Sequence, residues 1–508
     1  MARSLGPQTR IAVIGAGRMG AGIAQLAAQA GHAVQLFDLQ EGAAERALGR
    51  IAADLSGAVK RGRMDEAERN AVLARLSRSA SLEQLAGCGL VIEAIIETLD
   101  AKQALFKQLE AVLAHEAVFA TNTSSISITA VAQGLSHPER VIGWHFFNPA
   151  TRMKLVEVIR GVATDPALPA LMHELGRAWG KTSVDAPNAP GFIVNRVARP
   201  YYAEGLRLLA EGIAPPQAID RVLREAGGFA LGPFELIDLI GVDVNLSVTE
   251  SVFAATAWDS RYAPSLIQQE LVRAGHFGRK TEQGFYDYRD GAKPPLAAAV
   301  VPAATMLALH AGTQPGLLEP LFERLQGSGV AVMSDTSLAP ESFRLGDAHF
   351  ALTDGRTAAA RSASLAVPIA LLDIARDYAT TTLLAATGSA ESLAALASVL
   401  QAAGIALIAL ADVAGLVLMR TVACLANEAA DVLTWSRGAA GDITAADIDT
   451  AMRLGTAYPI GPLTWADELG ASRIVAVLEN LQAHYGDARY RRAPLLSARH
   501  YQRSRFHG

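Results

Sequence analysis

The chain has 508 residues, of which 51% are hydrophobic and 19% charged, and its net charge is −5. These values predict three or four domains with sizeable cores and exclude a largely disordered chain, and the mild charge argues against nucleic-acid or membrane partners. Two isolated cysteines, Cys88 and Cys424, provide neither a disulfide framework nor a metal-binding pair, so we expect a reducing, cytoplasmic location and no metal.

The amino terminus, MARSLGPQTR, has no apolar core of the kind that a signal peptide needs. Two longer apolar stretches, residues 11–31 and 404–426, contain charged side chains at depths that would be costly in lipid. We therefore expect both stretches to be buried elements of a cytoplasmic protein that does not enter a membrane.

The first 190 residues alternate short apolar runs with stretches of helical length. The predicted strands are IAVI (11–14), AVQLF (33–37), LVIEAI (90–95), AVFATN (117–122), VIGWHFF (141–147) and LVEVI (155–159). Near-continuous apolar strands separated by helices predict a mostly parallel sheet with both faces covered. This is the doubly wound α/β pattern of a Rossmann domain.

The sequence GAGRMG at residues 15–20 follows the first strand and opens a helix, and the second strand ends at Asp38. This is the spacing of the dinucleotide-binding motif G-x-G-x-x-G and its acidic residue. Gly15 permits the tight turn, Gly17 lets a pyrophosphate approach the backbone, and Gly20 lets the helix pack closely on the strand. The Asp38 carboxylate would accept hydrogen bonds from the ribose hydroxyls and repel a 2′-phosphate, which favours NAD over NADP.

A histidine and a glutamate lie on neighbouring predicted strands. His145, in WHFFNP, stands beside aromatic residues, where a histidine is often only a core residue. Glu157 is surrounded by apolar residues in LVEVI, and a buried carboxylate needs a partner. A His–Glu pair holds one imidazole tautomer and stabilises its cation, which suits a general base. Asn195 and the hydroxyls of TNTSSISIT (121–129) offer further polar groups near strand ends, where such sheets bind ligands.

The pattern changes at DAPNAPG (185–191), and from there to about residue 290 it is helical. We expect residues 191–212 to form one long helix that is disturbed at Pro200. An Ala/Pro-rich linker follows. A second α/β region then extends to about residue 410 without a glycine motif, with predicted strands at 330–334, 380–386 and 405–410.

The helical segment occurs twice in the sequence. GFIVNR at 191–196 matches GLVLMR at 415–420, and LGPFELIDLIGVD at 231–243 matches IGPLTWADELGAS at 460–472. Two matches in the same order indicate a repeat, with a net insertion of five residues near RGAAGD (437–442). The strand–helix–strand pattern of 155–184 also has a weaker echo in 380–410.

The second copy lacks the chemical groups of the first. Met419 replaces Asn195, no glycine motif precedes it, and the stretch comparable to HFFNP reads IALLDIARD. Since a methionine cannot donate a hydrogen bond to a substrate oxygen, we expect the second copy to serve structure.

Several motifs, in this order and spacing, resemble the 3-hydroxyacyl-CoA dehydrogenases: GAGRMGAGIA, VIEAIIETLDAK, TNTSSISIT, HFFNP with LVEVI, PGFIVNR and GRKTEQGFYDY. The motifs span residues 10–290. The whole layout is similar to the long bacterial type linked to phenylacetate breakdown, with 3-hydroxyadipyl-CoA or 3-hydroxybutyryl-CoA as substrate. The resemblance implies that an L-3-hydroxyacyl-CoA thioester is oxidised to the 3-oxoacyl-CoA and that NAD takes the hydride.

The resemblance also implies the domain order. We expect a Rossmann NAD-binding domain (1–189), an all-α domain (190–290), a reduced Rossmann-like α/β domain (291–410) and a second, degenerate all-α domain (411–508). Helical domains of this family pair in dimers, so the chain is expected to form a homodimer or an internal pseudo-dimer.

Roles follow by motif position. His145 would take the proton of the substrate 3-hydroxyl, Glu157 would orient His145, and Ser124 and Asn195 would hydrogen-bond the hydroxyl or the thioester carbonyl. The residues expected to line the cofactor, besides the glycine motif and Asp38, are Glu97, Lys102, Asn122, Asn148 and Lys280. The exposed pair Lys60 and Arg61 would contact the coenzyme A phosphates, although such a pair is equally often only solvated surface.

Two other functions stay open. A dehydrogenase of a free hydroxy acid would keep the fold and lose the coenzyme A site. A structural protein that binds NAD without turnover would not need His145, Glu157, Ser124 and Asn195, all of which are present. A fused hydratase domain is not expected, because the glycine motif begins at residue 15 and leaves no room upstream.

Overall fold

The computed structural model describes residues 5–436 and 443–508 and divides into two compact units. Unit 1 comprises Met1–Arg196 and Val432–Thr456, and unit 2 comprises Val197–Asp431 and Ala457–Gly508. The insertion predicted near 437–442 lies outside the described residues. In the part of the chain that is described, no helix is long and apolar enough to cross a membrane.

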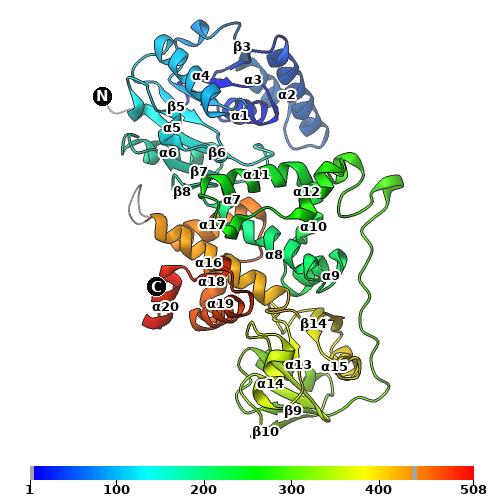
Figure 1. Ribbon diagram of the computed structural model, residues 1–508. Coiled ribbons are helices and arrows are strands. Elements are labelled where there is room, and N and C mark those ends of the chain that lie inside the picture. Colours follow the sequence, from blue (N-terminus) through cyan, green and yellow to red (C-terminus); the bar gives the residue numbers. More distant parts are fainter. Residues whose placement is uncertain (1–4, 437–442) are drawn as a thin grey trace. The chain divides into compact units, whose positions relative to one another are not determined.

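Unit 1 is built on an eight-stranded sheet in the order β3-β2-β1-β4-β5-β6-β7-β8 (Figure 1). Only β6 and β7 pair in the antiparallel sense. The strands are β1 Ile11–Ile14, β2 Val34–Phe37, β3 Leu76–Arg78, β4 Leu90–Glu93, β5 Val118–Thr121, β6 Val141–Phe146, β7 Leu155–Arg160 and β8 Thr182–Ala186. The doubly wound, mostly parallel sheet is therefore confirmed. The short, largely exposed β3 was not predicted because it has no apolar run.

Helices cover both faces of this sheet. They are α1 Arg18–Gln29, α2 Ala43–Lys60, α3 Glu66–Ala74, α4 Leu99–Val112, α5 Ile128–Val131, α6 Leu168–Ala178 and, from the second helical copy, α17 Ala445–Thr456. The buried sides of α1, α2 and α6 share one core cluster with Val13 and Trp144. Phe106 of α4 packs on Phe119 at a ring distance of 5.4 Å. Because side chains alternate along a strand, Trp144 in the core places His145 on the other face of β6.

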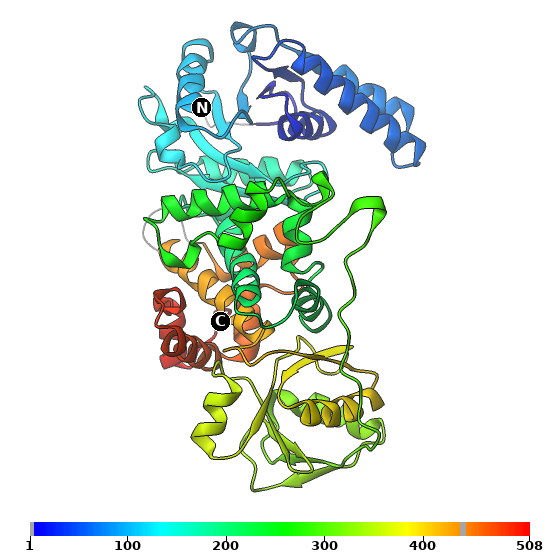
Figure 2. The same ribbon diagram turned by 45° about the vertical axis from the view of Figure 1, so that its right-hand side comes forward.

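Unit 2 contains a seven-stranded sheet in the order β10-β9-β11-β12-β13-β14-β15. Its elements are β9 Leu309–Gly312, α13 Glu319–Gly327, β10 Val332–Asp335, β11 Ser342–Leu345, β12 Ala348–Leu352, α14 Ala358–Leu365, β13 Ile369–Leu372, β14 Leu383–Thr387, α15 Ala390–Ala402 and β15 Ala406–Ala409. Figure 2 shows α15 lying along this sheet. The segment β13-β14-α15-β15 repeats β6-β7-α6-β8, including the antiparallel first pair. The echo predicted between 155–184 and 380–410 is thus a matching piece of α/β structure.

The helical repeat is also present. The first copy contains α7 Val194–Val197, α8 Arg199–Ala210, α9 Pro216–Arg221, a π-turn Val222–Ala226, α10 Pro233–Ile240, α11 Val242–Ala255, the 3₁₀ turn η4 Ser260–Tyr262 and α12 Leu266–Arg273. The second contains α16 Leu418–Ser436, α17, α18 Pro462–Leu469, α19 Ala471–Tyr485, the 3₁₀ turn η8 Ala488–Tyr490 and α20 Pro494–Gln502. Asp238 and Asp467, at equivalent places in α10 and α18, each accept two backbone N–H groups from the end of their copy.

The single helix expected over 191–212 is wrong, because the chain forms α7 and α8 instead. Pro200 lies in the first turn of α8, where a residue without an N–H group is tolerated, but it cannot continue the ladder from α7. The corresponding residue of the second copy is Cys424. There α16 continues without a break from Leu418 to Ser436.

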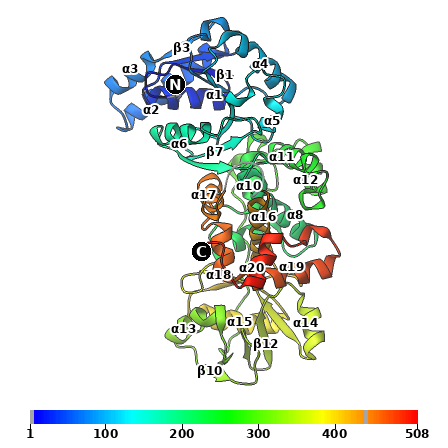
Figure 3. The same cartoon turned by 90° about the vertical axis from the view of Figure 1, so that its left-hand side faces the viewer.

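The two helical copies contact each other within unit 2. Arg420 of α16 is fully buried and binds Glu204 at 2.7 Å and Glu211 at 2.9 Å. In the opposite direction, Arg261 of η4 binds Glu428 of α16 at 3.0 Å. Glu204 and Glu428 are equivalent positions of the repeat, so each copy contributes the same glutamate to the contact. Figure 3 shows α16 beside α8.

The turns η4 and η8 add a reciprocal contact. Asp259, before η4, binds Arg491, after η8, and Ser260 donates a hydrogen bond to Asp487. Exchange of equivalent segments in both directions is the signature of a two-fold interface, here between two parts of one chain.

Candidate active site

The glycine motif forms the turn between β1 and α1. Gly15 has a φ of +102°, and a Cβ there would lie 2.4 Å from the Ala94 oxygen. A Cβ on Gly20 would lie 1.8 Å from the Gly15 oxygen. At Gly17, by contrast, a Cβ would meet no described atom within 4 Å. Gly15 and Gly20 are therefore required by packing, whereas Gly17 leaves open space beside the backbone.

The start of α1 suits an anion. Gly17 caps the helix without a side-chain hydrogen bond, and the first turn contains no acidic residue. The N–H groups of the first turn and the helix dipole are thus available to a phosphate. Asp38, directly after β2, accepts a hydrogen bond from Ala16 N–H at 2.6 Å and from Gln40 N–H at 2.8 Å. Its carboxylate therefore also holds the glycine turn in place. These residues fit the pyrophosphate and ribose of NAD.

His145 and Glu157 face each other across β6 and β7, where they form a register pair. His145 Nδ1 lies 2.7 Å from Glu157 Oε2, and the two residues are 5% and 0% exposed. A carboxylate at this distance fixes the Nδ1–H tautomer and leaves Nε2 with a lone pair. Nε2 has no hydrogen-bond partner among the described residues. The pair can therefore act as a general base.

The second oxygen of Glu157 has another task. Glu157 Oε1 accepts hydrogen bonds from the backbone N–H groups of Ile193 and Val194, each at 3.0 Å. These two hydrogen bonds connect β7 to the start of α7, which carries Asn195. Asn195 Nδ2 lies 3.5 Å from the Ser124 backbone oxygen. Glu157 thus positions both the imidazole and the turn that carries the asparagine.

Ser124 belongs to a polar cluster at the carboxyl ends of β4 and β5. Glu97 Oε1 accepts hydrogen bonds from Ser124 N–H at 2.7 Å, from the Ser124 hydroxyl at 3.1 Å and from the Thr123 hydroxyl at 2.7 Å. Lys102 is 1% exposed and binds Glu97 Oε2 at 3.1 Å. Burial alone would raise the pKa of Glu97, but Lys102 and these hydrogen bonds hold that pKa below its ordinary value.

Glu93, at the end of β4, was missed by the sequence analysis. Its buried carboxylate binds Lys102 Nζ at 2.6 Å and accepts hydrogen bonds from the Thr121 hydroxyl and from Ile95 N–H. A carboxylate inside the apolar run LVIEAI carried the same signal as Glu157 in LVEVI. Because Lys102 binds both Glu93 and Glu97, it neutralises their charge and holds the two carboxylates in place.

The other predicted residues are distributed more widely. Asn122 Oδ1 accepts Phe146 N–H at 2.8 Å and so joins β5 to the end of β6 beside His145. Asn148 is exposed on the following loop, and Lys60 and Arg61 are exposed at the end of α2. Lys280 lies in unit 2, where its Nζ binds Asp243 at 2.6 Å.

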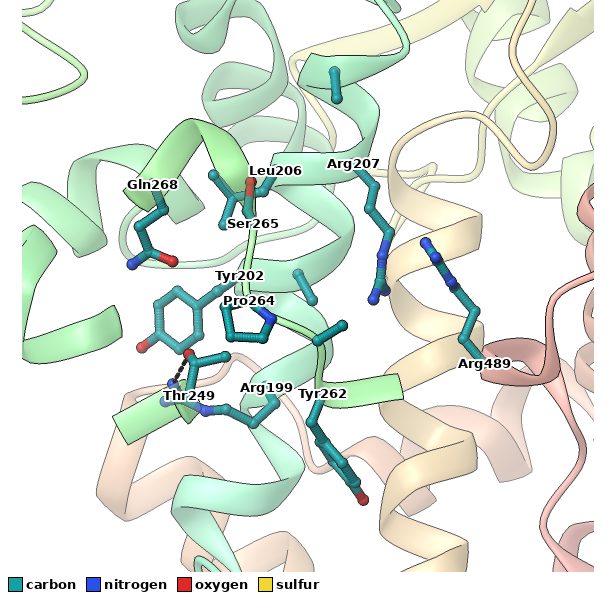
Figure 4. A pocket seen from close by; sticks show the side chains of 13 residues that line it. Arg199, Tyr202, Leu206, Arg207, Thr249, Tyr262, Pro264, Ser265, Gln268 and Arg489 are labelled. Atoms are coloured by element: carbon teal, nitrogen blue, oxygen red, sulfur yellow. Dashed lines mark hydrogen bonds between the residues drawn. The ribbon is translucent and has the colours of Figure 1, made fainter. Parts of the chain in front are cut away.

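Unit 2 contains a cavity of about 200 Å³ that is lined by the first helical copy, with Arg489 of the second copy at its rim. Figure 4 shows Thr249 hydrogen-bonded to Arg199 on one side, and Arg207 and Arg489 on the other. None of the predicted site residues lines this cavity. It is a feature of the packing among the helices of the first copy.

A Rossmann sheet with this glycine turn, and with a histidine–carboxylate pair at its carboxyl edge, defines the class of NAD-dependent dehydrogenases. The family model of the 3-hydroxyacyl-CoA dehydrogenase NAD-binding domain matches residues 10–189. The C-terminal-domain model of the same family matches twice, at 191–288 and 407–505. A reduced Rossmann-fold domain of 3-hydroxybutyryl-CoA dehydrogenase matches 350–413.

Individual proteins agree with these matches. A 3-hydroxyadipyl-CoA dehydrogenase from Escherichia coli is 43% identical over 96% of this chain and 97% of its own length. The crystal structure of a 3-hydroxybutyryl-CoA dehydrogenase from E. coli superposes with a TM-score of 0.87 at 41% identity, covering 97% of this chain and 98% of that one. A (S)-3-hydroxybutyryl-CoA dehydrogenase from Ralstonia eutropha reaches a TM-score of 0.54 at 37% identity, covering 56% of this chain and all of its own. The chain belongs to the 3-hydroxyacyl-CoA dehydrogenase family, whose members are NAD-dependent oxidoreductases.

Proposed function

We propose that the chain oxidises short L-3-hydroxyacyl-CoA thioesters with His145 as the base, and that 3-hydroxyadipyl-CoA is its substrate, with 3-hydroxybutyryl-CoA as a second. The observation that carries the role of His145 is its 2.7 Å contact with Glu157, which leaves Nε2 able to accept a proton. The full-length similarity to a 3-hydroxyadipyl-CoA dehydrogenase supports the choice of acyl group.

NAD, when bound, supplies the acceptor for the hydride that leaves C3 of the substrate. His145 Nε2 accepts the proton of the 3-hydroxyl group, and Glu157 balances the charge of the imidazolium through Nδ1–H. Ser124 and Asn195 hydrogen-bond the substrate hydroxyl or the thioester carbonyl and so fix the position of C3. Lys60 and Arg61 bind the coenzyme A phosphates.

The cofactor is held by the residues of the carboxyl edge. The first turn of α1 would bind the pyrophosphate at Gly17, and the Asp38 carboxylate would accept hydrogen bonds from the ribose hydroxyls. The remaining residues that we assign to the cofactor surface are Glu97, Lys102, Asn122, Asn148 and Lys280.

The first experiment measures NADH formation by wild type, His145→Ala and His173→Ala. His173 is the matched control, because it forms a second histidine–carboxylate pair in unit 1, with Asp185 at 3.1 Å. We expect His145→Ala to lower kcat by about 10²–10⁴-fold and His173→Ala to leave kcat unchanged. Equal activity of the three proteins would contradict the assignment of His145.

The second experiment identifies the acyl group. It compares kcat/KM for 3-hydroxyadipyl-CoA, 3-hydroxyhexanoyl-CoA and 3-hydroxybutyryl-CoA. The hexanoyl thioester has the chain length of the adipyl thioester without its terminal carboxylate. A preference for adipyl over hexanoyl supports recognition of the carboxylate, and the reverse order refutes it. Free 3-hydroxybutyrate tests the alternative of a hydroxy-acid dehydrogenase.

We further propose the four-domain division at residues 189, 290 and 410, with the second helical domain as an internal partner of the first. The Arg420–Glu204 and Arg261–Glu428 contacts support this arrangement. The chain is then a monomer in solution, and a homodimer in light scattering would require a second interface. A cytoplasmic location suits the two buried free thiols, Cys88 and Cys424.

A further inference from the structure

His115, His137 and Glu139 form a cluster in unit 1 that the dehydrogenase reaction does not use. His115 precedes β5, and His137 and Glu139 precede β6. Because β5 and β6 are parallel, the cluster lies at the amino ends of these strands. Asn122 and His145 lie at the opposite, carboxyl ends. A ligand at the cluster would therefore not meet the reacting atoms.

Three atoms of the cluster converge. His115 Nε2 and His137 Nδ1 are 3.0 Å apart, His137 Nδ1 and Glu139 Oε1 are 3.2 Å apart, and His115 Nε2 and Glu139 Oε1 are 3.9 Å apart. In a tetrahedral zinc site with bonds of about 2.0–2.1 Å, the ligand atoms are roughly 3.3–3.4 Å apart. The triangle thus has the size of one face of such a tetrahedron.

Hydrogen bonding explains this convergence poorly. His137 Nδ1 contacts both His115 Nε2 and Glu139 Oε1, yet one imidazole nitrogen directs only one N–H group or one lone pair. The two contacts compete for it in every neutral tautomer. A divalent cation would remove the competition, since each of the three atoms could then give a lone pair to the ion.

The backbone around the cluster is held by a buried ion pair. Arg140 is almost completely buried and donates hydrogen bonds to Glu110 at 3.2 Å and to the Ala114 oxygen at 3.0 Å. The Glu110 carboxylate in turn accepts the backbone N–H groups of Ser136 and His137. One guanidinium therefore fixes the segments that carry both histidines, as supporting groups do in metal sites.

We propose that His115, His137 and Glu139 bind a divalent transition-metal ion, with Zn²⁺ as the best fit and water in the fourth position. Two imidazoles and one carboxylate suit Zn²⁺, whereas Mg²⁺ prefers oxygen ligands in an octahedron. The site has no role in catalysis. It fastens the segment before β5 to the segment before β6 and stabilises the NAD-binding unit. This departs from the sequence-based expectation of no metal.

The test uses the untagged full-length protein after treatment with a chelator. Titration calorimetry with ZnCl₂ compares wild type, His115→Ala, Glu139→Gln and the control His173→Ala, which removes another histidine of the same unit. We expect one Zn²⁺ per chain in wild type and control, and an affinity at least about 10-fold weaker in both cluster variants. Zn²⁺ should raise the unfolding temperature of wild type and control only.

Two outcomes would overturn the proposal. One is equal Zn²⁺ affinity in wild type and His115→Ala, and the other is weak binding of several ions to every variant. Circular dichroism shows whether the variants are folded. NADH formation by His115→Ala should equal that of wild type, so the proposed dehydrogenase function and the metal site can fail independently.

Discussion

Glu157 and Asp373 hold the same turn of the two helical copies, but from different strands. Glu157, on β7, accepts two backbone N–H groups at the start of α7. Asp373, directly after β13, accepts three at the start of α16, from Val417, Leu418 and Met419. Only Glu157 also binds a histidine. An acidic residue thus anchors the start of the helix in both copies, but only the anchor of the first copy also binds a histidine that can act as a base.

This difference predicts that amide substitution lowers kcat at Glu157 but lowers only the stability at Asp373. Glu157→Gln removes the carboxylate that stabilises the His145 cation, so kcat should fall by about 10²–10⁴-fold. Asp373→Asn should leave kcat unchanged but lower the free energy of unfolding by about 1–3 kcal/mol, because an amide serves the three N–H donors less well. NADH assays and urea unfolding of both variants check this. Loss of turnover in folded Asp373→Asn would contradict the division of roles.

Asp373 also predicts a pH dependence of stability. Burial raises the pKa of this carboxyl to about 6, even though the N–H groups around Val417 favour its charge. Since the folded-state pKa lies above the ordinary value, folding takes up a proton, and this proton-linked part of the stability is present in acid and is lost as the pH rises. The stability of wild type relative to Asp373→Asn should therefore fall between about pH 4 and about pH 6, by at most about 1.4 kcal/mol per pH unit. Urea unfolding of both proteins across this range measures the difference, and a rise with pH would contradict it.

The equivalent positions Asn195 and Met419 provide a second matched pair. Asn195→Ala should lower kcat/KM by about 10–100-fold, the loss expected for a hydrogen bond worth about 1.5–3 kcal/mol. Met419 is fully buried. Met419→Asn should restore no activity and should destabilise the fold by about 1–3 kcal/mol, because its amide would be buried without partners. A double variant, Asn195→Ala with Met419→Asn, that turns over faster than Asn195→Ala alone would show that the second copy is catalytic after all.

Gly17 and Gly49 separate cofactor binding from folding. A Cβ at either position meets no described atom within 4 Å. Gly17→Ala should leave the unfolding temperature nearly unchanged but place a methyl group where the pyrophosphate approaches, so the Kd for NAD should rise at least about 10-fold. Gly49→Ala, within α2, should leave that Kd unchanged and stabilise the protein by about 0.5–1 kcal/mol. Fluorescence titration with NAD and thermal unfolding distinguish the two. An unchanged Kd in Gly17→Ala would refute the proposed pyrophosphate site.

Arg420 predicts how strongly the two helical copies depend on each other. Burial opposes the charge of Glu204, yet Arg207 and Arg420 hold its pKa down at about 2. Arg420→Met removes one of these partners and should lower the free energy of unfolding by about 3–5 kcal/mol. The control, Arg273→Met, breaks the exposed pair with Glu270 and should cost at most about 1 kcal/mol.

The contribution of Arg420 to the free energy of unfolding should fall in acid, because its partner Glu204 becomes protonated there. Because the folded-state pKa lies below the ordinary value, the stabilisation is present above about pH 4.5 and is lost as the pH falls toward about 2. Urea unfolding of wild type and Arg420→Met at neutral and acid pH measures this loss. Equal destabilisation at both pH values would contradict it.

The sequence by itself determined the features that depend on residue types at short, fixed spacing. The glycine turn before α1, its partner Asp38 and the apolar strands of the first sheet, but not the exposed β3, follow from local conformation and apolar pattern. The repeat was equally visible, because two copies of one helical segment keep the same caps and glycine–proline pairs. His145 and Glu157 could be paired because a charged residue in an apolar strand requires a partner.

The tertiary structure alone decided which distant groups meet. Lys102 binds Glu93 and Glu97 because the beginning of α4 lies beside the carboxyl end of β4, and the sequence contained several cations that could have filled that place. The packing of α17 on β7 and β8 assigns part of the second helical copy to unit 1. Apolar pattern shows that a helix face must be buried but not against which surface, since the hydrophobic effect is non-directional and many partners offer similar area. The partner of each helix is therefore determined only by the packing of the whole tertiary structure.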